Sequence, residues 1–485
     1  MKLVSAETKI RIDLSKCQYE ILEEVVSDLK WDNDNFEKPD IIWQDSALNP
    51  MSLSLLSPYQ RINHFPGMYA ISRKDYLAKH LKAMEQLHKS EFEFFPETWV
   101  LPQEYISLKT HMASNTNAYY ICKPPNLSQG KGIFLTKWIS DIPENCVVQK
   151  YLENPYLLDG FKFDLRLYVL VTGFDPLRVY IHEQGIVRLA TIPYAKPTDT
   201  NIHNIYMHLT NYAINKNNPN FVHNKNYSED FVGHKRSFKS FLKALEEDGH
   251  NIKKIMARID DIVLKTLCTV QPFIVNLYRT SQPNDTSSAV CFQILGFDIL
   301  LDYKLRPSLL EVNHTPSFTT DSPLDRKVKK AVIKDCLKMI AAKPECQKKF
   351  LREHTDYLIE RSFHSFYRVK LVKSERREKF LKHQIEMETT FHGGYRKIYP
   401  LNNIEKYQKY MRDAEGVYSS KARRRNRESE IRCVPRLRKS SADKRFIIDD
   451  NKNQNRRRSC VTRISLVPKV VQIKINNDFI GGARA

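Results

Sequence analysis

The fold is decided by two neighbouring segments, Gly296-Phe297-Asp298-Ile299-Leu300-Leu301-Asp302 and Leu309-Leu310-Glu311-Val312-Asn313. Each reads as an apolar strand interrupted by polar groups that a hydrophobic core does not need. Glu311 and Asn313 point to the same side of their strand, because strand side chains repeat every two residues. With Asp298 they supply three oxygen ligands of the kind that Mg²⁺ prefers. The two segments therefore predict a magnesium site and, through it, a nucleotide.

The chain upstream supplies candidate phosphate-binding groups. Tyr120-Ile121-Cys122-Lys123 reads as a strand that delivers a lysine at its end. In the nearby loop Gln129-Gly130-Lys131-Gly132, two glycines free backbone N–H groups to face an anion, and the lysine neutralises it. The loop is not a Walker A motif, because Gly132 follows the lysine and Pro125 stands where the first glycine would be. Taken alone, the loop is explained at least as well by an ordinary turn as by a phosphate-binding site.

Two strand patterns further along suit a nucleotide. Gln149-Lys150-Tyr151-Leu152 ends a strand whose backbone groups could meet a purine edge, although the residues alone fit an edge segment more often. Phe161-Lys162-Phe163-Asp164-Leu165-Arg166 places three charged side chains on one side of a strand. That strip is either a salt-bridged exposed face or a surface for a polyphosphate and a ribose, and the second explanation accounts better for its charge.

One arginine and one polar segment each allow more than one interpretation. Arg188 lies inside an apolar strand, so it is either paired in the core or aimed at a carboxylate. His208-Leu209-Thr210-Asn211-Tyr212 offers hydroxyl and amide groups that, by themselves, indicate only capping or turn chemistry.

The charge of the chain is distributed unevenly. The formal net charge is +21 over 485 residues, yet residues 1–340 hold 41 Lys/Arg against 39 Asp/Glu, whereas residues 341–485 hold 36 against 17. A nearly neutral body with a cationic extension indicates an anionic partner for the extension. A nucleic-acid partner would need a recognition motif, and neither the aromatic–glycine pattern of RNA-binding domains nor zinc-finger spacing is present.

The cysteines and the apolar runs indicate the compartment. Nine scattered cysteines form no C-x-x-C pair, which favours a reducing compartment over a disulfide framework. No apolar run approaches the ~20 residues of a membrane span, and the first residues lack the apolar core of a signal peptide. We therefore expect a cytoplasmic protein without a membrane partner.

Periodicity predicts an α+β body that ends near residue 340. Helices are expected at 72–89, 238–248, 252–269 and after residue 323, and strands at 118–188, 289–302 and 308–313. A charge-rich helical segment follows to about residue 412, with one break at His392-Gly393-Gly394-Tyr395. From about residue 420 the Arg-rich chain lacks apolar periodicity and predicts a disordered basic tail.

The order of these motifs resembles that of the tubulin–tyrosine ligase-like enzymes. The resemblance runs from about residue 9 to about 410 and includes Asn63-His64-Phe65-Pro66-Gly67, Phe95-Pro96-Glu97-Thr98-Trp99 and Asp159 to Arg166. Glu311 to Phe318 is most similar to the polyglutamylase branch of that family.

The resemblance implies an ATP-grasp ligase fold. We expect an N-terminal α/β domain at 1–110, a central ATP-grasp domain at 111–190 and a C-terminal ATP-grasp domain at 191–340. A basic helical microtubule-binding segment would occupy 341–415, and a disordered basic tail 416–485.

The resemblance also implies roles for single residues. ATP would be held by Lys123, Gln129, Gly130, Lys131, Gly132, Gln149, Lys150, Tyr151, Leu152, Lys162, Asp164, Thr210 and Asn211. Mg²⁺ would be held by Asp298, Glu311 and Asn313. Free glutamate would be held by Arg188, Tyr212, Lys235 and His314. The catalytic residues would be Arg166, Arg188 and Glu311.

The implied activity is an ATP-dependent addition of glutamate to glutamate side chains or chains on tubulin tails, through an acyl phosphate. The partners would be tubulin, microtubules and free L-glutamate, the protein a monomer, and the location the cytoskeleton, a cilium or a basal body. A glycylase and a non-catalytic microtubule-binding protein are the alternatives.

The chain differs from the family pattern at Pro125-Asn126-Leu127, in the phosphate loop, and at Ala213, where a hydroxyl is lost.

Overall fold

The computed structural model describes residues 9–34, 36–127, 129–224, 231–283, 285, 288–341, 352, 355, 366–401 and 404–433, with the backbone alone at 366–374, 376 and 421–433. Residues 1–428 group as one unit, which holds all the contacts reported below. None of the helices in these ranges is long and apolar enough to cross a membrane.

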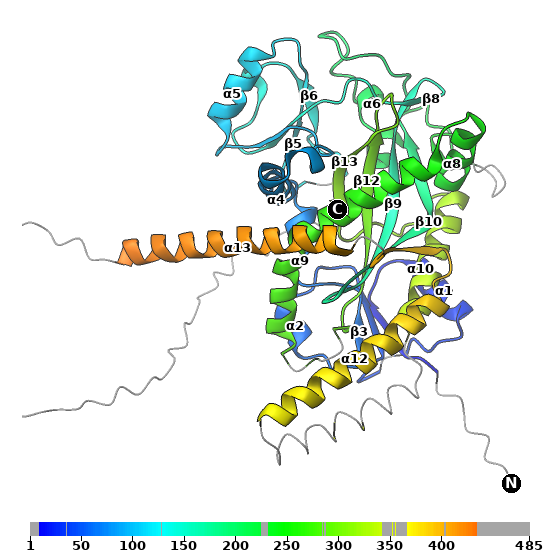
Figure 1. The fold of residues 1–485 in the computed structure, drawn as a ribbon. Coiled ribbons are helices and arrows are strands. Elements are labelled where there is room, and N and C mark those ends of the chain that lie inside the picture. The colour runs from blue at the N-terminus through cyan, green and yellow to red at the C-terminus, as the bar shows by residue number, and fades with distance from the viewer. Residues whose placement is uncertain are drawn as a thin grey trace, which may run out of the picture. The chain divides into compact units, whose positions relative to one another are not determined.

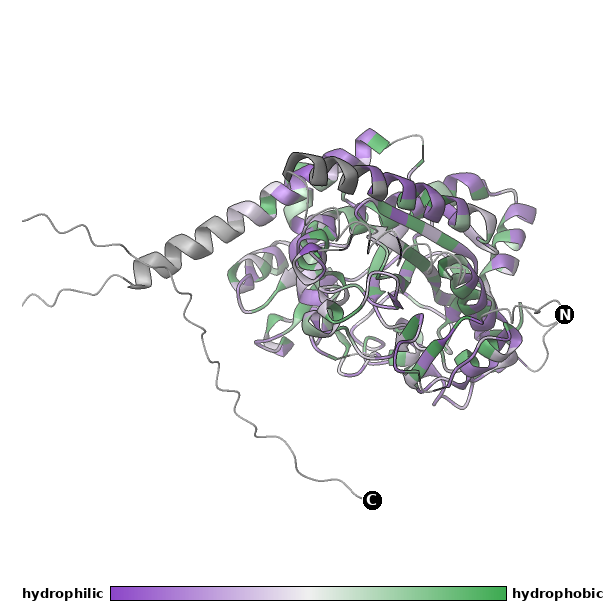
Figure 2. Cartoon of the chain, turned by 90° about the horizontal axis from the view of Figure 1, so that it is seen from below, coloured by the Kyte–Doolittle hydropathy of each residue, from purple (hydrophilic) through white to green (hydrophobic). Residues whose placement is uncertain are grey.

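A seven-stranded sheet forms the centre of this unit (Figure 1). Its main path runs β11 (Lys235–Ser237), β10 (Leu177–Leu189), β9 (Phe161–Phe174), β12 (Gln293–Leu301) and β13 (Pro307–Asn313), and each neighbouring pair is antiparallel. The short strand β8 (Leu157–Leu158) pairs with β9. Hydrophobic residues concentrate on the strands, whereas the surrounding helices alternate in hydropathy (Figure 2). This pattern is typical of a buried sheet covered by amphipathic helices.

A smaller antiparallel sheet has the order β4 (Thr98–Val100), β7 (Val147–Lys150), β5 (Tyr120–Lys123) and β6 (Phe134–Thr136). Helix α5 (Tyr105–Ser114) packs on it through Leu108 and Met112, which share a core with Trp99, Tyr120 and Val148. Strands β5 and β7 are antiparallel neighbours, so Lys123, at the end of β5, lies opposite Val147, whereas Lys150, at the end of β7, lies opposite Tyr120. Both strands carry predicted nucleotide residues.

The N-terminal sheet is parallel and has the order β1 (Ile12–Lys16), β2 (Ile41–Gln44) and β3 (Arg61–Ile62). Helix α1 (Glu20–Asp28) buries Ile21, Leu22, Val25 and Val26. Its exposed side meets α10 (Pro323–Ile340) through an ion pair of 2.7 Å between Glu24 and Arg326.

The other helices cover the central sheet or connect its strands. They are α2 (Pro50–Ser54), α3 (Tyr69–Ser72), α4 (Lys74–Leu87), α6 (Ile205–His208), α7 (Tyr212–Asn215), α8 (Phe238–Glu247) and α9 (Ile252–Ser281), with short 3₁₀ turns η1 (Lys89–Glu91) and η2 (Ile139–Asp141). The helix expected at 72–89 is α4, which begins after Arg73, whereas Ser72 is the last residue of α3.

Helix α9 is twelve residues longer than the prediction of 252–269, because it continues to Ser281 through Pro272. A proline in a helix interior costs about 3 kcal/mol. Ile274, Val275 and Tyr278, which follow it, are buried in the main core. Their burial offsets the cost of the proline, an effect that local sequence signals do not contain.

The segment after residue 365 also differs from the prediction. The expected break at 392–395 leads into a strand, β14 (Tyr395–Tyr399), which lies between helix α12 (Phe366–Thr390) and helix α13 (Ile404–Cys433). Strand β14 adds to the central sheet beside β10. Part of the predicted disordered tail, residues 416–433, is helical, whereas 434–485 lies outside the described residues.

The structure confirms the α+β class. It also places β9 and β10 in the same sheet as β11, β12 and β13. The predicted domain boundary at residue 190 therefore falls inside one continuous sheet.

Candidate functional site

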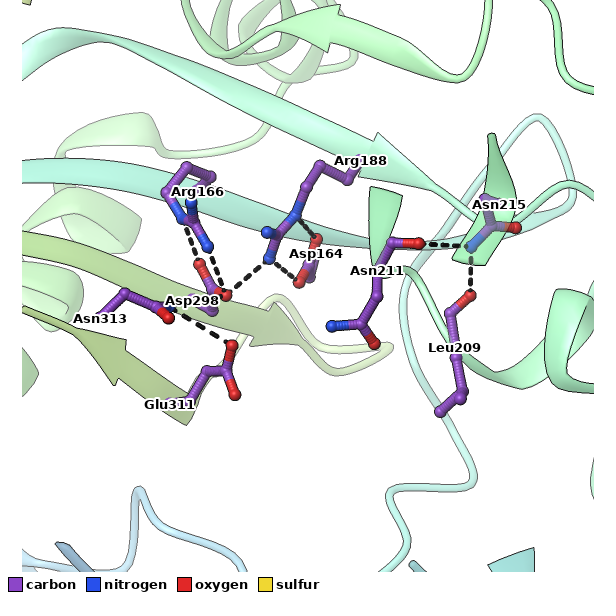
Figure 3. A network of polar contacts seen from close by, with 9 residues as sticks. All are labelled: Asp164, Arg166, Arg188, Leu209, Asn211, Asn215, Asp298, Glu311 and Asn313. Atoms are coloured by element: carbon purple, nitrogen blue, oxygen red, sulfur yellow. Dashed lines mark hydrogen bonds and ion pairs between the residues drawn. The ribbon is translucent and has the colours of Figure 1, made fainter. Parts of the chain in front are cut away.

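The charged centre of the site is formed by four adjacent strands of the central sheet, β10, β9, β12 and β13 (Figure 3). Asp298 on β12 lies directly opposite Arg166 of β9 on one side and Glu311 of β13 on the other. One strand further, Arg188 of β10 pairs in register with Asp164 of β9. The alternation of side chains along each strand brings these charged groups to one face of the sheet.

The three predicted metal ligands converge. The amide nitrogen of Asn313 lies 3.4 Å from Oδ2 of Asp298 and 3.3 Å from Oε1 of Glu311. Two carboxylates and an amide around one point fit a hard divalent cation. Such an ion would take the amide oxygen of Asn313, which half a turn of the amide group provides.

Two arginines neutralise the carboxylates behind this point. Arg166 holds Asp298 with two bonds of 2.6 and 2.9 Å. Arg188 reaches Asp298 at 2.8 Å and forms a two-bond pair with Asp164. Burial raises the pKa of Asp298, but the charges of Arg166 and Arg188 outweigh it and hold that pKa well below its usual range. Asp298 is therefore ionised, as a metal ligand must be.

Two buried lysines face the same region. Lys123, at the end of β5, donates to Oε1 of Gln149 at 2.7 Å. Lys162 of β9 donates to the hydroxyl of Tyr151 at 2.8 Å and to the carbonyl of His208 at 2.9 Å. Burial lowers the pKa of Lys123 to about 8 and that of Lys162 to about 7. A polyanion beside them would restore their positive charge.

A pocket connects these lysines with the metal ligands. Of the predicted ATP-binding residues, those that line it are Lys123, Gln149, Lys150, Tyr151, Leu152, Lys162, Asp164, Thr210 and Asn211; Asp298 and Glu311 line it too. We call it the nucleotide pocket. Its apolar wall is formed by Ile121, Ile133, Leu209, Leu300 and Leu310.

The glycine-rich loop occupies a different place. Gln129 and Lys131 line a neighbouring cleft instead of the nucleotide pocket, and neither space is lined by Gly130 or Gly132. Gly130 has φ of +79°, and a Cβ atom there would lie 2.4 Å from the Ile214 side chain. The positive φ and this close approach both favour glycine. Lys74 of α4 holds the same loop with a 2.7 Å bond to the carbonyl of Leu127.

The neighbouring cleft, of about 1540 Å³, contains the remaining predicted site residues: Arg166, Arg188, Tyr212, Lys235, Glu311, Asn313 and His314. We call it the substrate cleft. Glu311 and Asn211 line both the cleft and the nucleotide pocket. The two spaces therefore meet at the metal ligands.

Sequence reasoning missed an acidic partner in this cleft. Asp325 of α10 is 1% exposed and pairs with Lys235 at 2.5 Å, and with Lys329 at 3.3 Å. Lys235 also lies 3.3 Å from the centre of the Tyr212 ring. A buried Asp and Lys four residues apart on a helix are a detectable signal, but their partner is 90 residues away in sequence.

Asn215 was also missed. It is fully buried, and its amide donates to the carbonyls of Leu209 at 2.8 Å and Asn211 at 3.1 Å (Figure 3). Its oxygen accepts from the backbone of Thr191 at 3.0 Å. The side chain therefore fixes the loop that carries Thr210 and Asn211 against the end of β10.

Known proteins with similar sequences identify the family. Residues 52–350 match the tubulin-tyrosine ligase family. The chain is 42% identical over 388 residues to a probable beta-tubulin polyglutamylase of Tetrahymena thermophila, covering 78% of this chain and 32% of that protein. It is 40% identical over 436 residues to the human tubulin polyglutamylase TTLL6, covering 87% of this chain and 48% of that protein.

A third relative is the mouse tubulin polyglutamylase TTLL13, which is 39% identical over 438 residues, covering 86% of this chain and 52% of that protein. The chain thus spans about a third to a half of the length of these relatives. Because the family match covers more than half of the 485 residues and includes both the metal ligands and the buried lysines, the chain belongs to the tubulin-tyrosine ligase family.

Proposed function

We propose that the protein is an ATP-dependent ligase that adds glutamate to glutamate side chains or chains on tubulin tails. The observation that supports it best is the junction at Glu311, where a pocket with two buried lysines meets a cationic cleft. The names of the relatives, which are tubulin polyglutamylases, support the same substrate.

ATP and Mg²⁺ fit the residues of the nucleotide pocket. Lys123 and Lys162 would hold the phosphates, and Asp298, Glu311 and Asn313 would hold the metal. The strand end at 149–152 offers backbone groups beside Ile121 and Leu300 to the adenine. When bound, magnesium and ATP supply an activated phosphoryl group and neutralise its charge.

The reaction forms an amide from a carboxylate, which is a poor electrophile. Transfer of the γ-phosphoryl group from ATP to the acceptor carboxylate would give an acyl phosphate and ADP. Attack by the amine of glutamate would then form the amide, with release of inorganic phosphate and of one proton from the amine. Arg166 and Arg188 lie in the substrate cleft beside Asp298, so their guanidinium groups can stabilise the anionic intermediate. Glu311 links the two spaces and would align the metal with the acceptor.

The donor amino acid would bind in the substrate cleft. Arg188, Tyr212, Lys235 and His314 line it. The pairing of Lys235 with Asp325 fixes its ammonium group in place, so that it can donate to a carboxylate without losing conformational freedom. A dicarboxylic amino acid fits the two cations of this set, Arg188 and Lys235, better than glycine does.

The segment after residue 365 would hold the microtubule. Lys379 and Lys382 of α12 are exposed, whereas Arg377 pairs with Asp175 at 2.8 Å. The other candidate positions, Arg368, Lys370, Lys373 and Arg376, lie where only the backbone is described. Acidic tubulin tails complement such a surface, and we place the protein on the cytoskeleton, including cilia and basal bodies.

The test is the substitution Glu311→Gln. It keeps the size of the side chain but removes one ligand charge, so ATP-dependent incorporation of labelled glutamate into microtubules should fall by at least about 100-fold. Glu246→Gln, on the exposed side of α8, is the matched control and should leave incorporation unchanged. Full activity of Glu311→Gln would contradict the assignment.

The same assay identifies the amino acid that the protein adds to tubulin. Mass spectrometry of the tubulin tails after incubation with ATP and either glutamate or glycine should show only glutamate additions. Glycine additions would identify a glycylase. Microtubule binding without any addition, and without ATP binding, would identify a non-catalytic member of the family.

A further inference from the structure

Gln293, the first residue of β12, makes a complete set of hydrogen bonds with its side chain. The side chain is 1% exposed. Its nitrogen donates to the backbone carbonyl of His314 at 2.7 Å and to Nδ1 of His64 at 3.2 Å. Its oxygen accepts from the backbone N–H of Phe65 at 2.9 Å. Both N–H groups and the amide oxygen therefore have partners.

The orientation of this amide is set by His64. Nε2 of His64 lies 2.7 Å from the carbonyl of Gln44, which can only accept, so Nε2 carries the proton and Nδ1 is the acceptor. Burial lowers the pKa of His64 to about 4, so the ring is neutral at pH 7. The N–H groups of Gln293 must consequently face His64 and His314.

The preceding residue anchors the histidine. Asn63 exchanges two hydrogen bonds with the backbone of Gln44: its oxygen accepts at 3.0 Å and its nitrogen donates at 2.8 Å. Asn63 and His64 are 7% and 2% exposed. The motif Asn63-His64-Phe65 thus connects the N-terminal parallel sheet, through Gln293, with the residue that follows the metal ligand Asn313.

We propose that Gln293 is a positioning residue that, oriented by Asn63-His64-Phe65, sets the place of His314 in the substrate cleft. The inference rests on the proposed function and deepens it. His314 lines the substrate cleft directly after Asn313. A shift of its backbone moves a substrate-contacting side chain while Lys123 and Lys162, on other strands, stay in place.

The experiment compares Gln293→Met with Gln282→Met. Both replace a buried glutamine whose nitrogen holds a backbone carbonyl, but Gln282 bonds to Leu56 at 3.0 Å, outside both the pocket and the cleft. Gln293→Met should raise KM for glutamate or for the acceptor peptide by about 5-fold or more, and leave the Kd for ATP within about two-fold. Gln282→Met should change neither.

A double-mutant cycle with His314→Ala separates positioning from stability. If Gln293 acts through His314, the effect of Gln293→Met on KM should fall below about two-fold in the His314→Ala background. An undiminished effect in that background, or a parallel loss of ATP affinity, would overturn the proposal.

His64→Leu provides a second variant if Gln293→Met fails to fold. It removes one acceptor but keeps the bond to His314, so KM should rise in the same direction by about two- to three-fold. An unchanged KM in His64→Leu would count against the proposal. Wild-type protein that adds no amino acid would instead refute the proposed function, which keeps the two failures distinguishable.

Discussion

Gly130 shows how one residue sets the shape of the glycine-rich loop. Alanine at this position meets the Ile214 side chain and adopts a positive φ, whereas at Gly249, with φ of +82°, a Cβ would meet nothing within 4 Å. Both substitutions share the backbone cost of about 1–2 kcal/mol. We predict that Gly130→Ala weakens ATP binding by about 5-fold or more and that Gly249→Ala does not. Calorimetric titration with ATP measures both, and equal affinities would contradict the close approach.

The two buried lysines predict a proton uptake on ATP binding. With pKa values of about 8 for Lys123 and about 7 for Lys162, the first is half neutral and the second largely neutral at pH 8. A bound triphosphate raises both values, so roughly one proton or more should enter with ATP at pH 8, and ATP affinity should fall as the pH rises from 7 to 9.

Titration calorimetry in phosphate and in Tris, whose ionisation enthalpies differ, measures this uptake. Lys162→Met should lower the number of protons taken up by roughly one, because the neutral lysine at pH 8 is removed. If the wild-type protein takes up no protons at pH 8, the lysines do not contact the phosphates.

At the residue scale, the local sequence pattern was enough to predict a site residue where all the residues concerned lie on one strand. Lys162 and Asp164 alternate on β9 and line the same pocket, as the spacing of two residues predicts. Arg188 could be explained either way from sequence, because its partners Asp164 and Asp298 come from two other strands. Asp325 and Gln293 were overlooked for the same reason: each gains its role from a contact with a distant part of the chain.

Among the elements, α12 is attached to the central sheet by a buried ion pair. Glu388 is 1% exposed; it bonds to Arg178 at 3.1 Å and accepts from the hydroxyl of Tyr180 at 2.7 Å. Removing one partner of a buried pair costs about 3–5 kcal/mol, because the other charge stays buried. We predict a loss of this size in the free energy of unfolding for Glu388→Ala.

Urea unfolding checks this prediction, with Glu386→Ala as the control. Glu386 lies two residues earlier on α12 and is exposed, so its removal should cost less than about 0.5 kcal/mol. Similar losses in the two variants would show that α12 is not fixed to the sheet through Arg178.

Helices and strands were predictable where hydrophobic periodicity is strong. The prediction failed where contacts with distant parts of the chain determine the secondary structure. Helices α8 and α10 follow their apolar pattern. Strand β14 follows a Gly-Gly turn and is only five residues long, and it becomes a strand by pairing with Val179 to His182 of β10. No pattern within residues 395–399 indicates that partner strand, which lies more than 200 residues earlier in the sequence.

For the whole molecule, the charge distribution predicts a salt-dependent attachment to microtubules. We predict that replacing Lys379 and Lys382 with glutamine weakens microtubule binding by about 3-fold or more at low salt. The difference should disappear near 0.3 M salt, where screening acts within roughly 6 Å. Lys253 and Lys254, exposed at the start of α9, provide a control with the same change of charge. Co-sedimentation with microtubules measures both, and equal losses would indicate a non-specific effect.

Residues of β14 and of the first part of α13 pack into the body of the protein, which periodicity predicts to end near residue 340. Tyr395, Ile398 and Tyr399 of β14 are buried, and so are Tyr410 and Ala414 of α13. His88 of the connection after α4 bonds to Asp413 at 2.8 Å. The α+β class followed from composition and periodicity, but this packing could not, because charged segments read as solvated helices until their partners are known.

The pairing of β14 with β10 has a consequence for how the chain is made. Residues 179–182 leave the ribosome 213 residues before Tyr395, the first residue of their partner strand. At ~5–20 residues per second this interval lasts about 10–40 s. During that time the edge of a long, hydrophobic strand stays open, and such edges join to other chains. Nascent chains halted before residue 395 should therefore require chaperones and self-associate, whereas completed chains have closed that edge.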